Sequence, residues 1–390
     1  MRILHVLGKL DRGGVETWLV QLLRQVDRSR YQMDFLVHTT AAGAYDEEVK
    51  ALGARIIPCL QHDRPLTYAK NFRAVLKTYG PYDCVHSHVH HYSGYVLLLA
   101  RLFGVPVRIA HSHTGKLETK ASPPRKIYLL LMRMLLARNA TAGIAVSELA
   151  GNSLNSSWKS KRCWHLLPYG IDMCRFSPGN HTNLRPLLGI RSAVPVVGHV
   201  GRFVDVKNHK KFVEIARELV RIDPNIHFLL VGDGPLRLQV EADIAIAGLK
   251  DHFTLAGNRA DVPEILQGVM TAFLFPSQYE GLPIALMEAQ LAGLPCIASD
   301  AITPEAALGL GMVTWLPLTA SAADWANTIH RVLSRAERHS VSTKERERLS
   351  IESCCRDLTQ LYDRLAGNQI AQSTFSPTRP TRHESRMIKQ

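Results

Sequence analysis

Short apolar runs alternate with longer helical stretches along this chain, and after a break the whole alternation starts again. Such a rhythm is typical of parallel strands connected by crossing helices. The chain is therefore predicted to be an α/β protein with two Rossmann-like, doubly wound domains. The expected strands are 3–7, 33–37, 55–58, 84–87, 107–111 and 141–146, then 196–200, 227–231, 252–256, 272–275 and 295–298, with the later helices beginning near Lys207, Pro235 and Pro283.

The break between the two sets gives the domain boundaries. Residues 176–195 are rich in proline, glycine and asparagine and have no clear period, so we expect a linker there. At roughly 150 residues per domain, 390 residues suffice for two domains, 1–175 and 196–350. Helical spacing of apolar residues predicts a last helix at 351–366 that packs back on the first domain, and the polar residues 367–390 predict a disordered tail.

The composition is that of a soluble globular protein, with 46% hydrophobic and 21% charged residues. No apolar run approaches the ~20 residues that cross a bilayer, and the N-terminal apolar run is too short for a signal peptide. The seven cysteines contain no C-x-x-C pair, which excludes a zinc ribbon and favours a reducing compartment. A cytoplasmic location is therefore expected.

The net charge of +13 and the isoelectric point near 9.5 point to an anionic partner. The chain has no zinc-finger spacing, no RNP-like aromatic motif and no basic-region heptad, so no nucleic-acid partner is expected. A phosphate-bearing substrate and an anionic membrane surface remain.

Ligands of open parallel sheets bind beyond the carboxyl ends of the strands, and charged residues and glycines stand there in this sequence. Gly13 and Gly14 follow the first strand and open a helix, an arrangement that binds phosphate, although a turn without a ligand explains these glycines equally well. Arg202 and Lys207 follow strand 196–200 and can grip a diphosphate from two sides. Segment 231–237 is similar to a dinucleotide fingerprint, but Arg237 stands where its third glycine belongs.

Two carboxylates stand eight residues apart around the start of a predicted helix. Glu280 lies in the loop before Pro283, and Glu288 lies within the otherwise apolar helix that follows. A carboxylate in such a helix is unfavourable unless it is hydrogen-bonded, and a ribose diol supplies that partnership. Capping of a neighbouring backbone group is the alternative role for Glu288.

The Glu280 and Glu288 motif, with Gly201-Arg202, Lys207-Asn208 and Gly13-Gly14 before it, resembles the retaining glycosyltransferases of family 4, which have the GT-B fold with a central cleft. The resemblance covers about residues 1–365 and is strongest, over 275–300, to the branch that builds bacterial capsules and exopolysaccharides. It implies a nucleotide-sugar donor and no cofactor. It also implies catalytic roles for Arg202 and Lys207 at the diphosphate and for Glu280 at the sugar. Donor binding is implied for Glu288 at the ribose, for the amides of Gly281 and Leu282 at the sugar, for Gly13 and Gly14 at the diphosphate, and for Asn258 and Arg259 at the base.

Histidines follow two neighbouring strands of the first half, in the runs 86–91 and 111–113. No carboxylate or cysteine completes a ligand set beside them, so no metal is expected. The resemblance implies that His113 lies near the donor sugar, and His88 or His111 could contact the acceptor. Polar strand-end side chains bonded to backbone are the alternative for His86 and His111.

We therefore expect metal-independent sugar transfer, with retention, to a glycan or a polyprenyl-linked acceptor. The alternatives are a nucleotide-sugar epimerase, an oligosaccharide phosphorylase, or a basic adaptor that binds lipid or RNA without catalysis. Segment 123–138 is apolar on almost every side yet basic, which predicts peripheral attachment to the inner face of the cell membrane, with burial against the sheet as the alternative for its apolar side. Its cations, with two that precede it, are Lys116, Lys120, Arg125, Lys126, Arg133 and Arg138.

Overall fold

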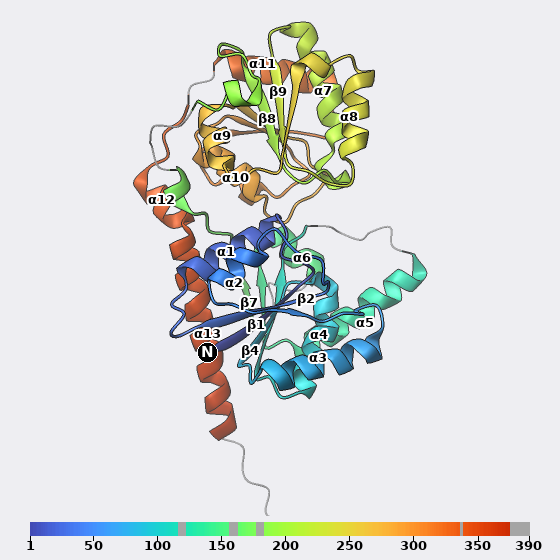
Figure 1. Cartoon of the computed structure of the whole chain (residues 1–390), viewed down its shortest axis with the longest axis vertical. Coiled ribbons are helices and arrows are strands. Elements are labelled where there is room, and N and C mark those ends of the chain that lie inside the picture. The colour runs from blue at the N-terminus through green and yellow to red at the C-terminus, as the bar shows by residue number, and fades with distance from the viewer. Residues whose placement is uncertain (116–121, 156–162, 177–182, 336–337, 375–390) are drawn as a thin grey trace, which may run out of the picture.

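The structure is a computed structural model, and it describes residues 1–115, 122–155, 163–176, 183–335 and 338–374 (Figure 1). It contains two parallel β-sheets, one above the other in the view of Figure 1, each flanked by helices. The predicted class, α/β with two doubly wound units, is confirmed.

The first sheet has seven parallel strands in the order β3-β2-β1-β4-β5-β6-β7. The strand order reverses beside β1, so the loops after β1 and β4 open at a topological switch point, where ligands of such sheets bind. The strands are β1 (Arg2–Leu7), β2 (Gln32–Val37), β3 (Ile56–Pro58), β4 (Cys84–Ser87), β5 (Val107–Ser112), β6 (Ala142–Ala145) and β7 (Trp164–Leu166). The helices are α1 (Gly14–Gln25), α2 (Asp46–Ala51), α3 (Pro65–Tyr79), α4 (Ser93–Leu102), α5 (Pro123–Asn139) and α6 (Glu148–Leu154).

The second sheet has six parallel strands in the order β10-β9-β8-β11-β12-β13, with the switch point beside β8. The strands are β8 (Val196–Val200), β9 (His227–Val231), β10 (Phe253–Gly257), β11 (Ala272–Phe275), β12 (Cys296–Ser299) and β13 (Val313–Leu316). The helices are α7 (His209–Ile222), α8 (Arg237–Ile246), α9 (Val262–Gly268), α10 (Ile284–Leu291) and α11 (Ala322–Ser334).

The predicted strands lie within one or two residues of the observed ones, because buried parallel strands read as continuous apolar runs. Two strands were missed, β7 and β13, and both lie at sheet edges. Their residues are only partly buried, so an apolar run is not required there. The expected linker contains one short 3₁₀ turn, Pro186–Leu188, and a second, Met173–Phe176, ends at its first residue, while residues 177–182 lie outside the described part.

The chain ends in α12 (Thr343–Leu349) and a long helix, α13 (Ile351–Thr374), that returns to the first sheet (Figure 1). The indole N–H of Trp18 on α1 donates to Sγ of Cys354 at 3.4 Å, and the hydroxyl of Tyr31 donates to Asp363 at 2.7 Å. The helix runs past the end expected at residue 366, and residues 375–390 of the predicted tail lie outside the described part. None of the described helices combines the length and the apolar character needed to cross a bilayer.

Candidate active site

The two sheets face each other through the loops that follow β5 and β11. Gly281 packs so closely on the backbone of the first domain that a Cβ there would collide with the carbonyl oxygen of His113. A Cβ on Gly115 would collide in the same way with the carbonyl oxygen of Glu280. The Ser147 hydroxyl donates to the carbonyl of Gly281 at 2.5 Å. The predicted sugar-binding loop therefore touches the strand end that carries His113.

Lys207 and Glu280 form an ion pair beyond the carboxyl ends of the central strands β8 and β11 of the second sheet. The ammonium donates to Oε1 of Glu280 at 2.7 Å, and the two side chains are only 16% and 17% exposed. The ammonium also lies 4.8 Å from the centroid of the Phe275 ring, a favourable cation–π contact. Asn208, at a positive φ of 55°, ties this loop to β11 by donating to the carbonyl of Pro276 at 3.1 Å. Two residues that lie 73 positions apart are thus brought together.

Arg202 lies in the same loop, and its side chain is exposed. Within the described ranges its guanidinium makes no ion pair or hydrogen bond, so it is available to an anion. Burial raises the pKa of Glu16 on α1 to about 7. The Glu16 backbone N–H opposes this rise, the charge of Asp11 adds to it, and the charge of Arg202 opposes it.

The N-terminus of α1 faces the second domain. A Cβ on Gly14 would lie 3.6 Å from Cδ1 of Ile284, the first residue of α10. The side chain of Glu16 folds back over Gly13, and a Cβ on Gly13 would collide with its carboxylate. Glu16 was not singled out from the sequence. An acidic residue in the first turn of a Gly-Gly helix was the available signal.

Glu288 lies one turn inside α10, which begins at Ile284. It is 7% exposed, and burial raises its pKa to about 7, with the charge of Arg175 opposing. Its carboxylate forms no hydrogen bond with any residue that the structure describes. A buried carboxylate without a partner is unfavourable, so this group is suited to accept hydrogen bonds from a ligand.

Of the two residues expected at the base, Asn258 and Arg259, only the first has a side chain that is not in an ion pair. Asn258 is exposed, whereas the guanidinium of Arg259 pairs with Asp261, with its Nε 2.8 Å from Oδ1. The Arg259 carbonyl accepts from Arg12 of the first domain at 2.6 Å. The structure therefore ties this loop to the opposite domain and leaves the Arg259 side chain engaged.

The segment similar to a dinucleotide fingerprint is a tight turn. A Cβ on Gly234 would lie 2.5 Å from the carbonyl oxygen of Phe203, and Gly232 has a positive φ of 132°. These glycines let the turn pack under the loop that carries Arg202. Their contacts favour the structural explanation over a dinucleotide site.

Five histidines gather in and just after β1, β4 and β5: His5, His86 and His111 are buried, and His88 and His113 are partly buried. His113 connects through Nε2 to Nδ1 of His88 at 2.8 Å, and His88 connects through Nε2 to Nδ1 of His5 at 3.0 Å. His86 connects through Nε2 to Nδ1 of His111 at 3.2 Å. Burial lowers the pKa of every one of them, to about 3 for His5 and His113, so all five are neutral at physiological pH. His5 was not predicted as a site residue, because it lies inside an apolar strand.

The pairing of β4 with β5 places the two histidine motifs side by side. Ring nitrogens of His88, His111 and His113 lie within 4.8 Å of one another, as do those of His5, His86 and His88. Three histidines can hold zinc without a carboxylate or cysteine, so the reason given for excluding a metal was incomplete. Several of these nitrogens are already paired at hydrogen-bond distances, and the predicted absence of a metal stays a prediction. Both ring nitrogens of His88 are engaged and His111 is fully buried, which leaves their predicted acceptor contact without support.

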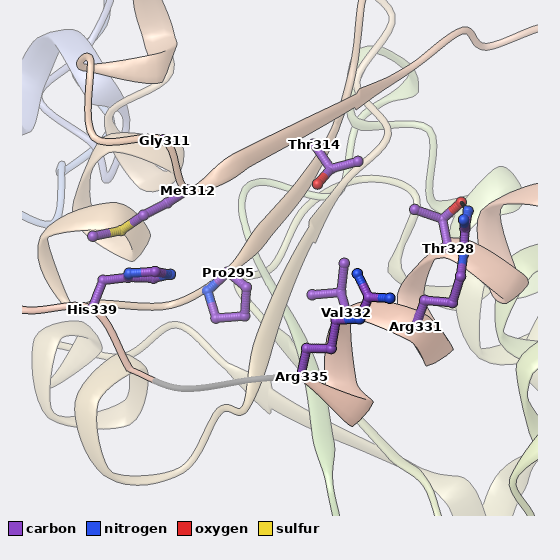
Figure 2. A pocket seen from close by; sticks show the side chains of 9 residues that line it. All are labelled: Pro295, Gly311, Met312, Thr314, Thr328, Arg331, Val332, Arg335 and His339. Carbon is purple, nitrogen blue, oxygen red and sulfur yellow. Dashed lines mark hydrogen bonds between the residues drawn. The ribbon is translucent and has the colours of Figure 1, made fainter.

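A cavity of about 340 Å³ lies away from this cleft, between β13 and the end of α11 (Figure 2). Pro295 and Met312 in its wall precede β12 and β13, so it opens at the amino ends of the strands, opposite the strand ends that lead to Lys207 and Glu280. Arg331 donates to the Thr328 hydroxyl at 3.1 Å within it. Its polar lining is largely exposed, and it takes no part in the arrangement around Glu280.

Two doubly wound parallel sheets that face each other through the loops after β5 and β11 define the class by its architecture, which is the GT-B fold of glycosyltransferases. The structure of HepE from Anabaena, solved with UDP and glucose, has the same fold. The TM-score is 0.69 with 20% sequence identity, and the match covers 96% of this chain and 99% of HepE.

Sequence comparison identifies the family. Residues 13–170 match the glycosyl transferase 4-like domain, and residues 180–350 match glycosyl transferases group 1. The putative glycosyltransferase EpsF of Bacillus subtilis is 39% identical over 336 residues, which are 85% of this chain and 87% of EpsF. The UDP-Gal:alpha-D-GlcNAc-diphosphoundecaprenol alpha-1,3-galactosyltransferase of Escherichia coli is 30% identical over 274 residues, 65% of this chain and 67% of that enzyme. The chain belongs to the group 1 (family 4) glycosyltransferases and is a retaining enzyme that uses a nucleotide sugar.

Proposed function

We propose that this enzyme transfers a hexose from a UDP-sugar to a glycan carried on a polyprenyl diphosphate, at the cytoplasmic face of the membrane, during assembly of a cell-surface polysaccharide. The UDP and glucose bound to HepE support the donor class. The diphosphoundecaprenol acceptor of the Escherichia coli relative supports the acceptor class.

The observation that carries the donor assignment is the buried, unpartnered carboxylate of Glu288. It accepts hydrogen bonds from the two hydroxyls of the donor ribose, which replace the water lost on burial. Arg202 and Lys207 then bind the diphosphate from one side, and the amides of Gly13 and Gly14, at the positive end of α1, bind it from the other. Asn258 and the backbone around Arg259 border the base.

The ion pair of Lys207 and Glu280 places an ammonium and a carboxylate side by side in the site before a ligand binds. When the diphosphate arrives, the ammonium shares its charge with the phosphate oxygens, and Glu280 turns to the sugar with the amides of Gly281 and Leu282. As the glycosidic bond breaks, negative charge grows on the diphosphate and positive charge on the sugar ring. Fixed cations and amides stabilise the first, so no metal ion is needed for this step.

The acceptor side is proposed to face the membrane through α5. One face of this helix is buried through Leu129, Met132 and Leu136. Its other face is exposed, and the helix carries four cations and no acidic residue. An exposed apolar face beside cations is suited to the headgroup layer of an anionic bilayer. The exposed apolar residues are Ile127 (69%), Leu130 (71%), Leu131 (44%) and Met134 (43%), whereas Lys116 and Lys120 lie outside the described residues.

A donor screen followed by a transfer assay tests this function. Thermal unfolding with a panel of nucleotide sugars is expected to show stabilisation by a UDP-sugar, since a ligand that binds only the folded state raises the melting temperature. That donor is then incubated with a polyprenyl-diphosphate-linked sugar, and an elongated lipid-linked product is expected. Conversion of the donor without an acceptor, or release of sugar phosphate, would contradict the proposal and favour an epimerase or a phosphorylase.

A further inference from the structure

We infer that Tyr169 and His88 act as positioning residues, which hold His113 as a neutral ring of fixed tautomer beside the transferred sugar. The inference rests on the proposed function for its consequence on turnover, and on the hydrogen bonds of the first domain for its geometry. Neither Tyr169 nor His88 is proposed to touch the reacting atoms, because both act through His113.

Both ring nitrogens of His113 are already engaged. The Tyr169 hydroxyl lies 2.7 Å from Nδ1 of His113, and Nδ1 of His88 lies 2.8 Å from Nε2 of the same ring. Tyr169 is 4% exposed, and the partly buried His113 packs against other rings, with Trp18 at 6.0 Å between centroids. A ring held at both nitrogens cannot rotate without breaking a buried hydrogen bond, and it has no free nitrogen for a sugar hydroxyl.

The direction of these hydrogen bonds follows from the chemistry of the groups. A neutral imidazole has one N–H donor and one nitrogen acceptor, so a row of neutral rings must donate in a single sense. Tyr169 keeps its proton because burial raises its phenolic pKa well above 10. No other acceptor for that proton is found among the described residues, so the hydroxyl donates to Nδ1 of His113. His113 then donates from Nε2 to His88, and His88 donates from Nε2 to His5.

A second row has the same construction. The Tyr362 hydroxyl lies 2.7 Å from Nδ1 of His86, and Nε2 of His86 lies 3.2 Å from Nδ1 of His111. Each row starts at a buried tyrosine and ends at a buried Nε2, on His5 and on His111, that has no described partner. The geometry therefore assigns the Nε2–H tautomer to all five histidines.

The neutral state of His113 matters for the reaction. Its strand end touches the loop of Glu280 and Gly281, so the ring lies close to the sugar that acquires positive charge. A protonated imidazole at that place would oppose this charge, whereas a neutral ring held by Tyr169 and His88 does not. The charged or titratable groups that face this region are Glu16, Glu280, His88, His90 and His111.

Nitrogen-15 NMR of the full-length protein labelled at histidine reads the tautomers directly. The expected spectrum at pH 7.5 shows a protonated Nε2 and a bare Nδ1 for the five histidines of the two rows, assigned with His→Gln variants. In Tyr169→Phe the signals of His113 and His88 are expected to shift, while those of His86 and His111 stay in place. Tyr362→Phe is the matched control, because it removes the same kind of hydrogen bond from the other row. This readout needs no donor or acceptor, so failure of the proposed function would leave it intact.

Turnover supplies the second measurement. Tyr169→Phe is expected to lower kcat about tenfold with the KM for the donor nearly unchanged, since one hydrogen bond to a positioned ring is lost. His88→Gln, whose amide can still pair with His113, is expected to retain more activity than His88→Ala, and it also serves if Tyr169→Phe fails to fold. An Nδ1–H or doubly protonated His113 at pH 7.5, or unchanged spectrum and kcat in Tyr169→Phe, would overturn the inference. A Co²⁺ absorption band that is lost in His111→Gln would overturn it as well, because the rings would then be metal ligands.

Discussion

Arg202 and Lys207 are two cations of one loop that differ in burial and in pairing. Lys207 is paired and mostly buried, whereas Arg202 is exposed and makes no described ion pair. Both are proposed to stabilise the charge that develops on the leaving diphosphate. We expect Arg202→Ala and Lys207→Ala each to lower kcat about a hundredfold, as loss of one such donor typically does.

The check is steady-state kinetics together with thermal unfolding. Lys210→Ala is the matched control, since Lys210 lies close to the same loop but is exposed at the start of α7. Wild-type kcat in either Arg202→Ala or Lys207→Ala would refute the assignment. A melting temperature that also falls strongly in these variants would show that the residues have a structural role instead.

Glu288 is expected to make donor binding depend on pH. Its pKa is about 7 in the donor-free protein, and only the ionised carboxylate accepts both ribose hydrogens. Donor affinity should therefore increase as the pH rises through about 7. Glu288→Gln should weaken binding about tenfold to a hundredfold and lose this dependence, because hydrogen bonds to charged groups are the strong ones. Calorimetric titration with the UDP-sugar between pH 6 and pH 8.5 measures both effects, and unchanged affinity in the variant would exclude the ribose role.

The histidine cluster bears on the expected independence from metal ions. Activity should survive excess EDTA, since Arg202, Lys207 and the α1 amides supply the positive charge that a divalent ion supplies elsewhere. Transfer assays with and without EDTA, followed by addition of Mn²⁺ or Mg²⁺, check this expectation. Loss on chelation with recovery on addition of the ion would reverse it.

The sequence predicted the strands and strand-end residues that a local pattern encodes. It did not predict the contacts that depend on which strands and helices lie side by side. Apolar runs located the central strands, and residues after strand ends located Arg202, Lys207 and Glu280. The ion pair of Lys207 with Glu280 depends on β8 lying beside β11, which no local pattern encodes. His5 and Tyr169 were missed for the same reason, since each gains its role only through a partner on another element.

The two faces of α5 explain why its sequence was ambiguous. Apolar residues on almost every side fit a buried helix, yet only one face is buried. We expect the protein to float with liposomes, more so as the fraction of anionic lipid rises and less as salt rises. Each basic residue near the surface adds about 1 kcal/mol, so replacing Arg125, Lys126 and Arg133 by Gln should weaken binding strongly.

Replacing exposed Leu130 by Ser, with buried Leu129 kept, separates the apolar contribution from the charge. Replacing Lys70, Arg73 and Lys77 on α3 by Gln removes the same number of exposed cations from another helix and serves as the control. No recovery with anionic liposomes at low salt would contradict membrane attachment and favour a soluble acceptor.

For the whole molecule, buried neutral histidines predict acid sensitivity. Burial lowers the pKa of His5 and His113 to about 3 and of His209 and His227 to about 4, against 6.5 in the unfolded chain. The unfolded state therefore binds more protons below pH 6.5, so the stability from these groups is complete above pH 6.5 and is lost as the pH falls toward 4. Buried carboxylates with a raised pKa act in the opposite sense between about pH 4.5 and 7, but they are fewer: Glu16 and Glu288.

We expect the melting temperature to fall by on the order of 5–10 °C between pH 7 and pH 5. Differential scanning calorimetry at constant ionic strength measures it, with urea unfolding at the same pH values as a check on reversibility. A melting temperature that is flat over this range would contradict neutral burial of the histidines.

The return of α13 to the first sheet has a consequence for synthesis of the protein. Domains generally fold as units while the ribosome makes them, the N-terminal one first. Here Trp18 and His86 of the first domain take partners from Cys354 and Tyr362, which are made after the entire second domain. The domain translated first is therefore finished last, and a ribosome-bound chain without its final helix carries an incomplete N-terminal core that a chaperone can recognise.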